Sequence, residues 1–161
     1  AETGPDRYRR TLYTVFYRSA PHPLFSTFDT PDMQTVCTRR IRSNSPLQSL
    51  TVANDVNFVE LAQGIAARVL GESASASAGD PELAIRRMFQ VTLCREPSGA
   101  ELDALRQYYA RLMKRFQDDA QQTTGLLAAG LMPADMPKSE AAALVGVARV
   151  LLNTDNFITR E

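Results

Sequence analysis

One segment near the end of the chain strongly limits the fold. Ser139 and Glu140 provide a helix start, and within residues 141–152 Arg149 is the single charged residue. A helix that is apolar on nearly all sides has to be surrounded by other elements, because water would otherwise contact its apolar side chains. The segment therefore predicts a central helix around which the rest of the chain packs.

Three earlier segments have the one-sided pattern of helices that pack against such a centre. Apolar residues recur at the i, i+3, i+4, i+7 spacing within residues 58–70, 85–93 and 102–116. A further short helix is expected from Ser45 and Pro46, which form a cap followed by a first-turn proline. The sequence thus predicts an all-α fold of four to five packed helices, with a long ordered N-terminal loop region.

Cap and stop residues predict the helix boundaries. Asp80 with Pro81 opens one helix, and Ser98 with Glu101 forms a capping box that opens the next. Glycines predict two ends: Gly71 stops the helix that contains residues 58–70, and Gly125 interrupts a short helical piece within residues 118–129. Residues 71–80 are small and polar, as in a surface linker.

The N-terminal third has a different composition. Residues 6–18 fit either a helix or a strand, with the helix slightly favoured, and residues 19–45 carry the prolines and small polar residues of a long irregular segment. We therefore expect residues 1–45 to be an N-terminal segment and long loop packed on a helical core of residues 46–161. The start of the sequence suggests one domain of a larger protein.

Charge and hydropathy bear on the class of partner. The 18 basic residues balance 18 acidic ones, which argues against nucleic acid as a partner, because nucleic-acid binding normally brings strong net basicity. No apolar run approaches the roughly 20 residues that span a bilayer, so no membrane span is expected. No cofactor motif is present, and we expect no cofactor and no metal.

The two cysteines leave several possibilities open. Cys37 and Cys94 fit no metal or redox spacing. They could form one long-range disulfide in an oxidising compartment, or be two separately buried thiols. A catalytic thiol would need a histidine partner, and His22, in a Pro-His-Pro loop, is the single histidine of the chain.

Residues 37–50 contain the group of side chains that most suggests a binding site. Their arginines can bind carboxylate, phosphate or sulfate through two parallel hydrogen bonds, and the following helix start adds free backbone N–H groups. Alternatively, these arginines pair with Asp29 and Asp32 and hold the loop down. Arg40 fits this clamp better than Arg42 does. The candidate ligand-binding residues are Arg39, Arg40, Arg42, Asn44, Gln48, Asp29 and Asp55.

Motifs spread over nearly the whole chain carry a resemblance to a known family. They are Tyr8-Arg9-Arg10, Leu12-Tyr13-Thr14, Arg18, Pro21, Phe28-Asp29, Cys37, Arg40, Arg42, Asn44-Ser45-Pro46-Leu47-Gln48, Asn54-Asp55, Phe58, Leu151-Leu152-Asn153, Phe157 and Thr159-Arg160-Glu161. In these motifs the chain resembles the C-terminal part of large secreted planctomycete proteins, catalogued as domain of unknown function 1553. Cys94 departs from the pattern, because the family has glycine there.

The resemblance implies a secreted or cell-envelope location. Proteins of the family also carry a second uncharacterised domain and often a cytochrome c-like domain, and polysaccharide breakdown or surface electron transfer is the implied setting. The resemblance supplies no catalytic residues.

Three hypotheses about function follow. The first is a non-catalytic helical module that packs on neighbouring domains of the parent chain, with an anionic ligand, such as an anionic glycan, as an additional partner. The second is part of an enzyme site for sulfated or uronic-acid polysaccharide, with Asp29 or Asp55 as acid or base. The third is a docking module for a cytochrome c-like domain.

Overall fold

The computed structural model describes residues 13–17, 19–31, 36–39, 43–73, 80–127 and 136–159. The chain divides into two compact units, Ala1–Ser43 and Asn44–Glu161. Each unit is described by itself. In the described residues every regular element is a helix, as predicted for an all-α fold.

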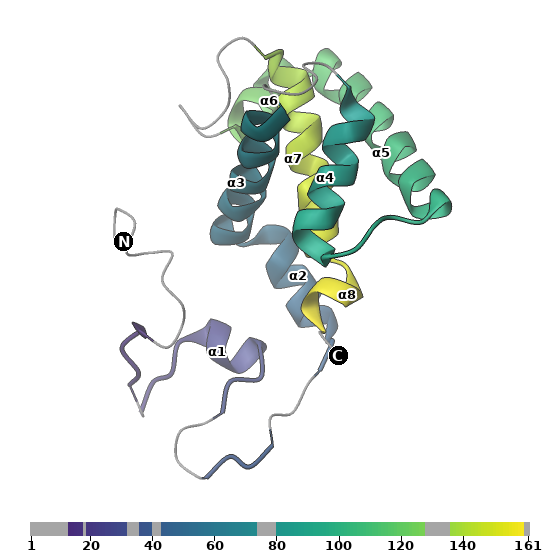
Figure 1. Cartoon of the computed structure of the whole chain (residues 1–161). Coiled ribbons are helices and arrows are strands. Elements are labelled where there is room, and N and C mark those ends of the chain that lie inside the picture. The colour runs from purple at the N-terminus through teal and green to yellow at the C-terminus, as the bar shows by residue number, and fades with distance from the viewer. Residues whose placement is uncertain are drawn as a thin grey trace. The chain divides into compact units, whose positions relative to one another are not determined.

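The second unit, which we call the helical unit, is a bundle around one central helix (Figure 1). Its helices are α2 (Pro46–Asn54), α3 (Val56–Ser73), α4 (Pro81–Leu93), α5 (Gly99–Asp118), α6 (Ala120–Leu126), α7 (Lys138–Leu152) and α8 (Asp155–Ile158). Helix α7 lies among α3, α4 and α5, and packs most extensively against α5 and α3.

Helix α7 is the centre that its composition predicts. Ten of its 15 residues are buried, including every residue from Ala141 to Ala148. It begins at Lys138, one residue before the predicted start, because Pro137 occupies the N-cap position. Small side chains let neighbouring helices approach it closely: a Cβ added at Gly146 would lie 2.3 Å from Cδ1 of Leu112 on α5.

The predicted helix starts are confirmed by their hydrogen bonds. Ser45 and Gln48 form a capping box at α2, and Ser98 and Glu101 form one at α5. Asp80 accepts a bond from the backbone N–H of residue 82 at 2.9 Å, with proline next to it in the first turn of α4. These bonds satisfy backbone donors that have no partner within the helix.

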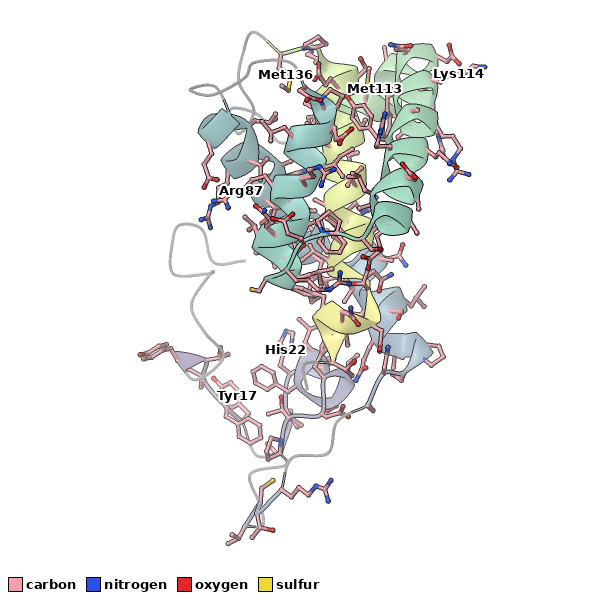
Figure 2. All side chains as sticks on the ribbon, turned by 45° about the vertical axis from the view of Figure 1, so that its right-hand side comes forward. Tyr17, His22, Arg87, Met113, Lys114 and Met136 are labelled. Atoms are coloured by element: carbon pink, nitrogen blue, oxygen red, sulfur yellow. The ribbon has the colours of Figure 1, made fainter. Side chains whose placement is uncertain are left out.

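The two predicted glycine stops are wrong. Helix α3 continues past Gly71 to Ser73, where Glu72 accepts bonds from Arg68 at 2.9 Å and from Arg87 of α4 at 2.8 Å. Figure 2 shows Arg87 extending from the outer side of α4, where it can reach that carboxylate. Gly125 lies inside α6 and does not interrupt it. Both glycines adopt helical geometry because contacts beyond the local sequence favour it.

In the first unit the described residues include one short helix within the segment predicted to be irregular. Helix α1 spans Pro23–Thr27, and Nδ1 of His22 accepts a bond from the backbone N–H of Leu24 at 3.3 Å. Phe16 and Phe25 stack with ring centroids 6.3 Å apart. Much of the predicted helix of residues 6–18 lies outside the described residues, and residues 14–17 form neither a helix nor a strand.

No helix in the described part of the chain combines the length and the apolar character that crossing a membrane requires.

Candidate functional site

The predicted ligand-binding residues of the first unit have structural hydrogen bonds where they are described. Oδ2 of Asp29 accepts bonds from the backbone N–H of Ser43 at 2.9 Å and from its hydroxyl at 2.7 Å. Asp29 itself has a φ of 54°, in the left-handed region. Arg39 is exposed, and its carbonyl accepts a bond from the Cys37 thiol at 3.4 Å. Arg40, Arg42 and Asp32 lie outside the described residues.

The other predicted residues lie in the helical unit, at the two ends of α2. Asn44 is bonded to the carboxylate of Asp155, and Gln48 is buried in the capping box, where its Oε1 accepts from the N–H of residue 45 at 3.0 Å. Asp55 follows α2 and accepts a bond from the backbone N–H of Asn57 at 2.8 Å. Asn44 and Gln48 are thus near each other at the start of α2, whereas Asp55 follows its last residue, about 10 Å along the helix from Gln48.

The structure confirms the helix cap predicted at Ser45, while the pairing of the loop arginines with Asp29 and Asp32 stays a prediction. Ser45 caps α2, and Asp29 holds the end of the loop at Ser43. An anion site at Arg39, Arg40 and Arg42 stays a prediction.

Both predictions for the cysteines are wrong. Cys37 and Cys94 are free, and both are exposed. Cys94 ends α4 with a φ of 55°, in the left-handed region that favours glycine. This conformation suits the glycine that the family resemblance led us to expect at this position. His22 uses Nδ1 to cap α1.

The helical unit contains a cavity of about 690 Å³, which we call the large cavity. One stripe of α5 and one stripe of α7 line it, with residues three and four apart on each helix. The end of α2 and the residues of α6 complete the wall. The residues that form these two stripes are Tyr108, Leu112, Arg115 and Phe116 on α5, and Gly146, Arg149 and Val150 on α7 with Asn153 at its C-cap.

Two arginines and no acidic residue line the large cavity. Arg149 is half-buried and donates to the backbone carbonyl of Ala53, at the end of α2. Arg115 is exposed and donates to Oε1 of Gln122 at 3.1 Å. Within the described parts of the chain, no carboxylate forms an ion pair with either arginine. The side chains that line the cavity therefore carry a net positive formal charge.

A buried hydrogen-bond acceptor also lies at this cavity. Among the described residues, two buried side-chain oxygens have no hydrogen-bond partner, Oδ1 of Asn153 and Oε1 of Gln63. Asn153 lines the large cavity, while Gln63 bonds through its Nε2 to the carbonyl of Leu126 at 2.6 Å. A buried acceptor without a partner is unfavourable by about 1–3 kcal/mol. Oδ1 of Asn153 is closed to solvent, so a donor in the cavity would stabilise it only after the amide turns.

A second cavity, of about 300 Å³, adjoins the first at Val150 and Thr154, and we call it the small cavity. Arg95 lines it and pairs with Glu101 through bonds of 2.6 and 3.0 Å, and its guanidinium lies 4.8 Å from the Phe89 ring centroid. Hydrogen bonds from Arg95 and from Ser98 lower the pKa of Glu101 to about 2. The charge of this arginine is therefore already compensated.

The sequence contained one signal for the large cavity. Arg149 is the single charge in the apolar segment of the central helix, and a charge at such a position needs a partner. No local pattern predicts that α5 and α2 meet around it. No group of His, Cys, Asp and Glu in the described part of the chain could hold a metal ion.

The described residues define a helical bundle with a half-open cavity that two arginines line. The family described as "Protein of unknown function (DUF1553)" matches residues 1–109, which is more than half of the chain. The chain belongs to this family, as its motifs predicted. The matched region ends within α5, so α7 and most of the large cavity lie beyond it.

Neither the curated proteins nor the solved structures contain a significant match to the chain.

Proposed function

We propose that the chain is a non-catalytic helical module of a larger secreted protein, and that it packs on a neighbouring domain through α2. The exposed apolar side of that helix carries the proposal. Leu47 and Leu50 are 59% and 60% exposed, although Gln48 and Val52 on the same helix are buried. Val56, at the start of α3, is 68% exposed.

An apolar side of this kind is suited to a protein contact. Leu47 and Leu50 are three residues apart and hence neighbours on the helix surface. Burying a leucine that is otherwise exposed is favourable by roughly 1.5–3 kcal/mol, and contiguous exposed apolar residues typically mark interaction sites.

Helix α2 is also held rigidly enough to present these leucines. Its start is fixed by the capping box of Ser45 and Gln48, and its last turn by the bond from Arg149 to Ala53. Binding of a partner would therefore cost little conformational entropy, because α2 is already ordered. Secretion is part of the proposal because the family resemblance implies it.

Hydrogen exchange tests the contact. The α2 amides are compared in the 161-residue chain and in the full-length natural gene product, with and without the double substitution Leu47→Glu and Leu50→Glu. We expect slower exchange in the full-length product, and loss of that protection in the double variant. The matched control is Leu83→Glu, at a 40% exposed leucine of α4.

Equal exchange of α2 in both contexts would refute the proposal, as would equal effects of the α2 double variant and of the α4 control.

A further inference from the structure

The charge of Arg149 is the starting point. Arg149 is half-buried, its guanidinium bonds to a backbone carbonyl, and in the described parts of the chain no carboxylate pairs with it. Partly desolvated charges are unfavourable unless an opposite charge or several hydrogen bonds compensate them. An anion in the large cavity would supply that opposite charge.

The direction of the helices places the two arginines at different ends of the cavity. Leu112 of α5 lies against Gly146 of α7, while Phe116 packs in one cluster with Ala142 and Ala143. Higher numbers on α5 thus face lower numbers on α7, and the two helices are antiparallel (Figure 1). Arg149 is at the α2 end, and Arg115 is at the α6 end.

The wall between these ends is mainly apolar. Leu112 and Gly146 meet in its middle, and Phe116 and Leu126 lie towards α6. Figure 2 shows that Lys114, a neighbour of this stripe on α5, points away from the helical unit, so it adds no charge to the wall. A volume of about 690 Å³ is within the range of small-molecule sites, roughly 300–1,000 Å³.

Asn153 places a buried hydrogen-bond acceptor near Arg149. The two residues are four apart on α7 and hence on the same side of the helix, about one turn from each other. Oδ1 of Asn153 is a buried acceptor without a partner. A turn of the amide about its terminal torsion, which is broad for asparagine, would bring this oxygen to the cavity. A ligand whose anionic group meets Arg149 would then satisfy it if the ligand carried a hydroxyl group close to that anionic group.

We propose that the large cavity binds an amphipathic carboxylate with a hydroxyl group near the carboxylate. The carboxylate accepts hydrogen bonds from Arg149, the Asn153 amide turns so that its Oδ1 accepts a bond from the hydroxyl, and the apolar body lies along Leu112 towards α6. The site goes beyond the proposed packing function, since α2 contributes only Ala53 to its wall.

The competing explanation is that Arg149 only stabilises helix ends. Arg149 is in the last turn of α7 and bonded to the last turn of α2, where a cation interacts favourably with the helix dipoles. That explanation predicts no preference among ligands, and binding experiments can therefore distinguish it from a ligand site.

Isothermal titration of the whole chain with four compounds is the first part of the test. The compounds are 3-hydroxydecanoate, decanoate, decylamine and glucuronate, each below the concentration at which it forms micelles. We expect 3-hydroxydecanoate to bind most tightly and decanoate more weakly. Decylamine and glucuronate should bind at least about tenfold more weakly than decanoate, because one has the wrong charge and the other no apolar body.

A matched pair of variants forms the second part. Val150 is 39% exposed at the cavity, so both Val150→Glu and Val150→Lys should fold. We expect the glutamate variant to lose about tenfold or more in affinity for decanoate and the lysine variant to lose none, because only the former repels a carboxylate. Asn153→Ala should reduce the affinity for 3-hydroxydecanoate to that for decanoate.

Four results would overturn the inference. They are no binding of either carboxylate, decylamine binding as tightly as decanoate, glucuronate binding as tightly as 3-hydroxydecanoate, and equal effects of the two Val150 variants. The first three deny the ligand class, and the fourth denies charge recognition in this cavity.

Discussion

The two adjoining cavities of the helical unit each contain an arginine, and these arginines differ in their hydrogen-bond partners. In the small cavity Arg95 has its own carboxylate, Glu101, which also belongs to the capping box of α5. In the large cavity Arg149 bonds to the carbonyl of Ala53, and no acidic residue lines the wall. An arginine paired with a carboxylate holds a helix end in place, whereas one without a carboxylate partner can also attract an anion.

Local sequence explains the difference. Glu101 lies six residues after Arg95, and a short turn brings them together before any helix packs on another. The partner of Arg149 lies 96 residues away along the chain, so that contact forms only when α2 and α7 meet. The large cavity is consequently a product of tertiary packing.

The largest expected difference between the two arginines is in stability. Arg149→Gln should lower the free energy of unfolding by about 1.5–3 kcal/mol, because a charged hydrogen bond to a partly buried carbonyl is lost. Arg95→Gln should have a smaller effect, because Arg95 is solvent-exposed and Ser98 still caps α5. Urea unfolding measures both, with Arg115→Gln as the control within the same cavity. Equal losses for Arg149→Gln and Arg95→Gln would remove the contrast.

A gain in stability is expected at the end of α4, beside the small cavity. Cys94 has a φ of 55°, which is unfavourable for a residue with a Cβ. Cys94→Gly should raise the free energy of unfolding by about 0.5–1 kcal/mol, measured in the same urea experiment. Cys94→Ala is the control, since it removes the thiol but keeps the Cβ. A gain in both variants would point to the thiol rather than to the backbone.

The pH dependence of stability should reveal the compensated pair. The pKa of Glu101 is lowered from 4.5 to about 2, so the folded state binds this proton less readily than the unfolded state does. The stabilisation of the folded state by ionised Glu101 is therefore fully present above pH 4.5 and is lost as the pH falls towards 2. Unfolding temperatures between pH 5 and 2 should fall less steeply for Glu101→Gln than for the parent. Parallel curves would show that the pair contributes nothing.

The smallest expected change in stability is at the floor of the large cavity. In Gly146→Ala the new Cβ would displace Cδ1 of Leu112, the mobile end of a half-buried side chain, which can turn into the cavity. The gain in helix propensity, about 1 kcal/mol, offsets this strain, so stability should change by less than about 1 kcal/mol. The affinity for decanoate should nevertheless fall several-fold in titration.

Gly64→Ala is the control for that change, because a Cβ there meets nothing within 4 Å. It should leave the affinity for decanoate unaltered. An unchanged affinity in Gly146→Ala would place the ligand outside the large cavity.

Helix identity was predictable from local chemistry, and the cavity was not. The caps at Ser45, Asp80 and Ser98 act through hydrogen bonds to residues at most three positions away, and the apolar composition of residues 141–152 suffices to make α7 central. These features need no knowledge of the partner helix.

The wrong predictions concern features that depend on contacts between residues distant in the sequence. Gly71 and Gly125 lie within helices that are held by more distant contacts, such as the bond from the Thr123 hydroxyl to the carbonyl of Phe116 at 2.8 Å. The loop arginines were predicted to form a site because they are clustered in the sequence. Arg149 and Asn153 come to line a cavity only through the packing of the helices around them.

Nuclear magnetic resonance during a titration with 3-hydroxydecanoate tests the central claim most directly. We predict saturable shifts of the amide signals of Gly125, Gly146 and the Asn153 side chain, with one common dissociation constant and little change at the Arg95 side chain. Equal shifts around Arg95 and Glu101, or none at Gly146 and Asn153, would contradict the claim that Arg149, which has no carboxylate partner among the described residues, makes the large cavity an anion site.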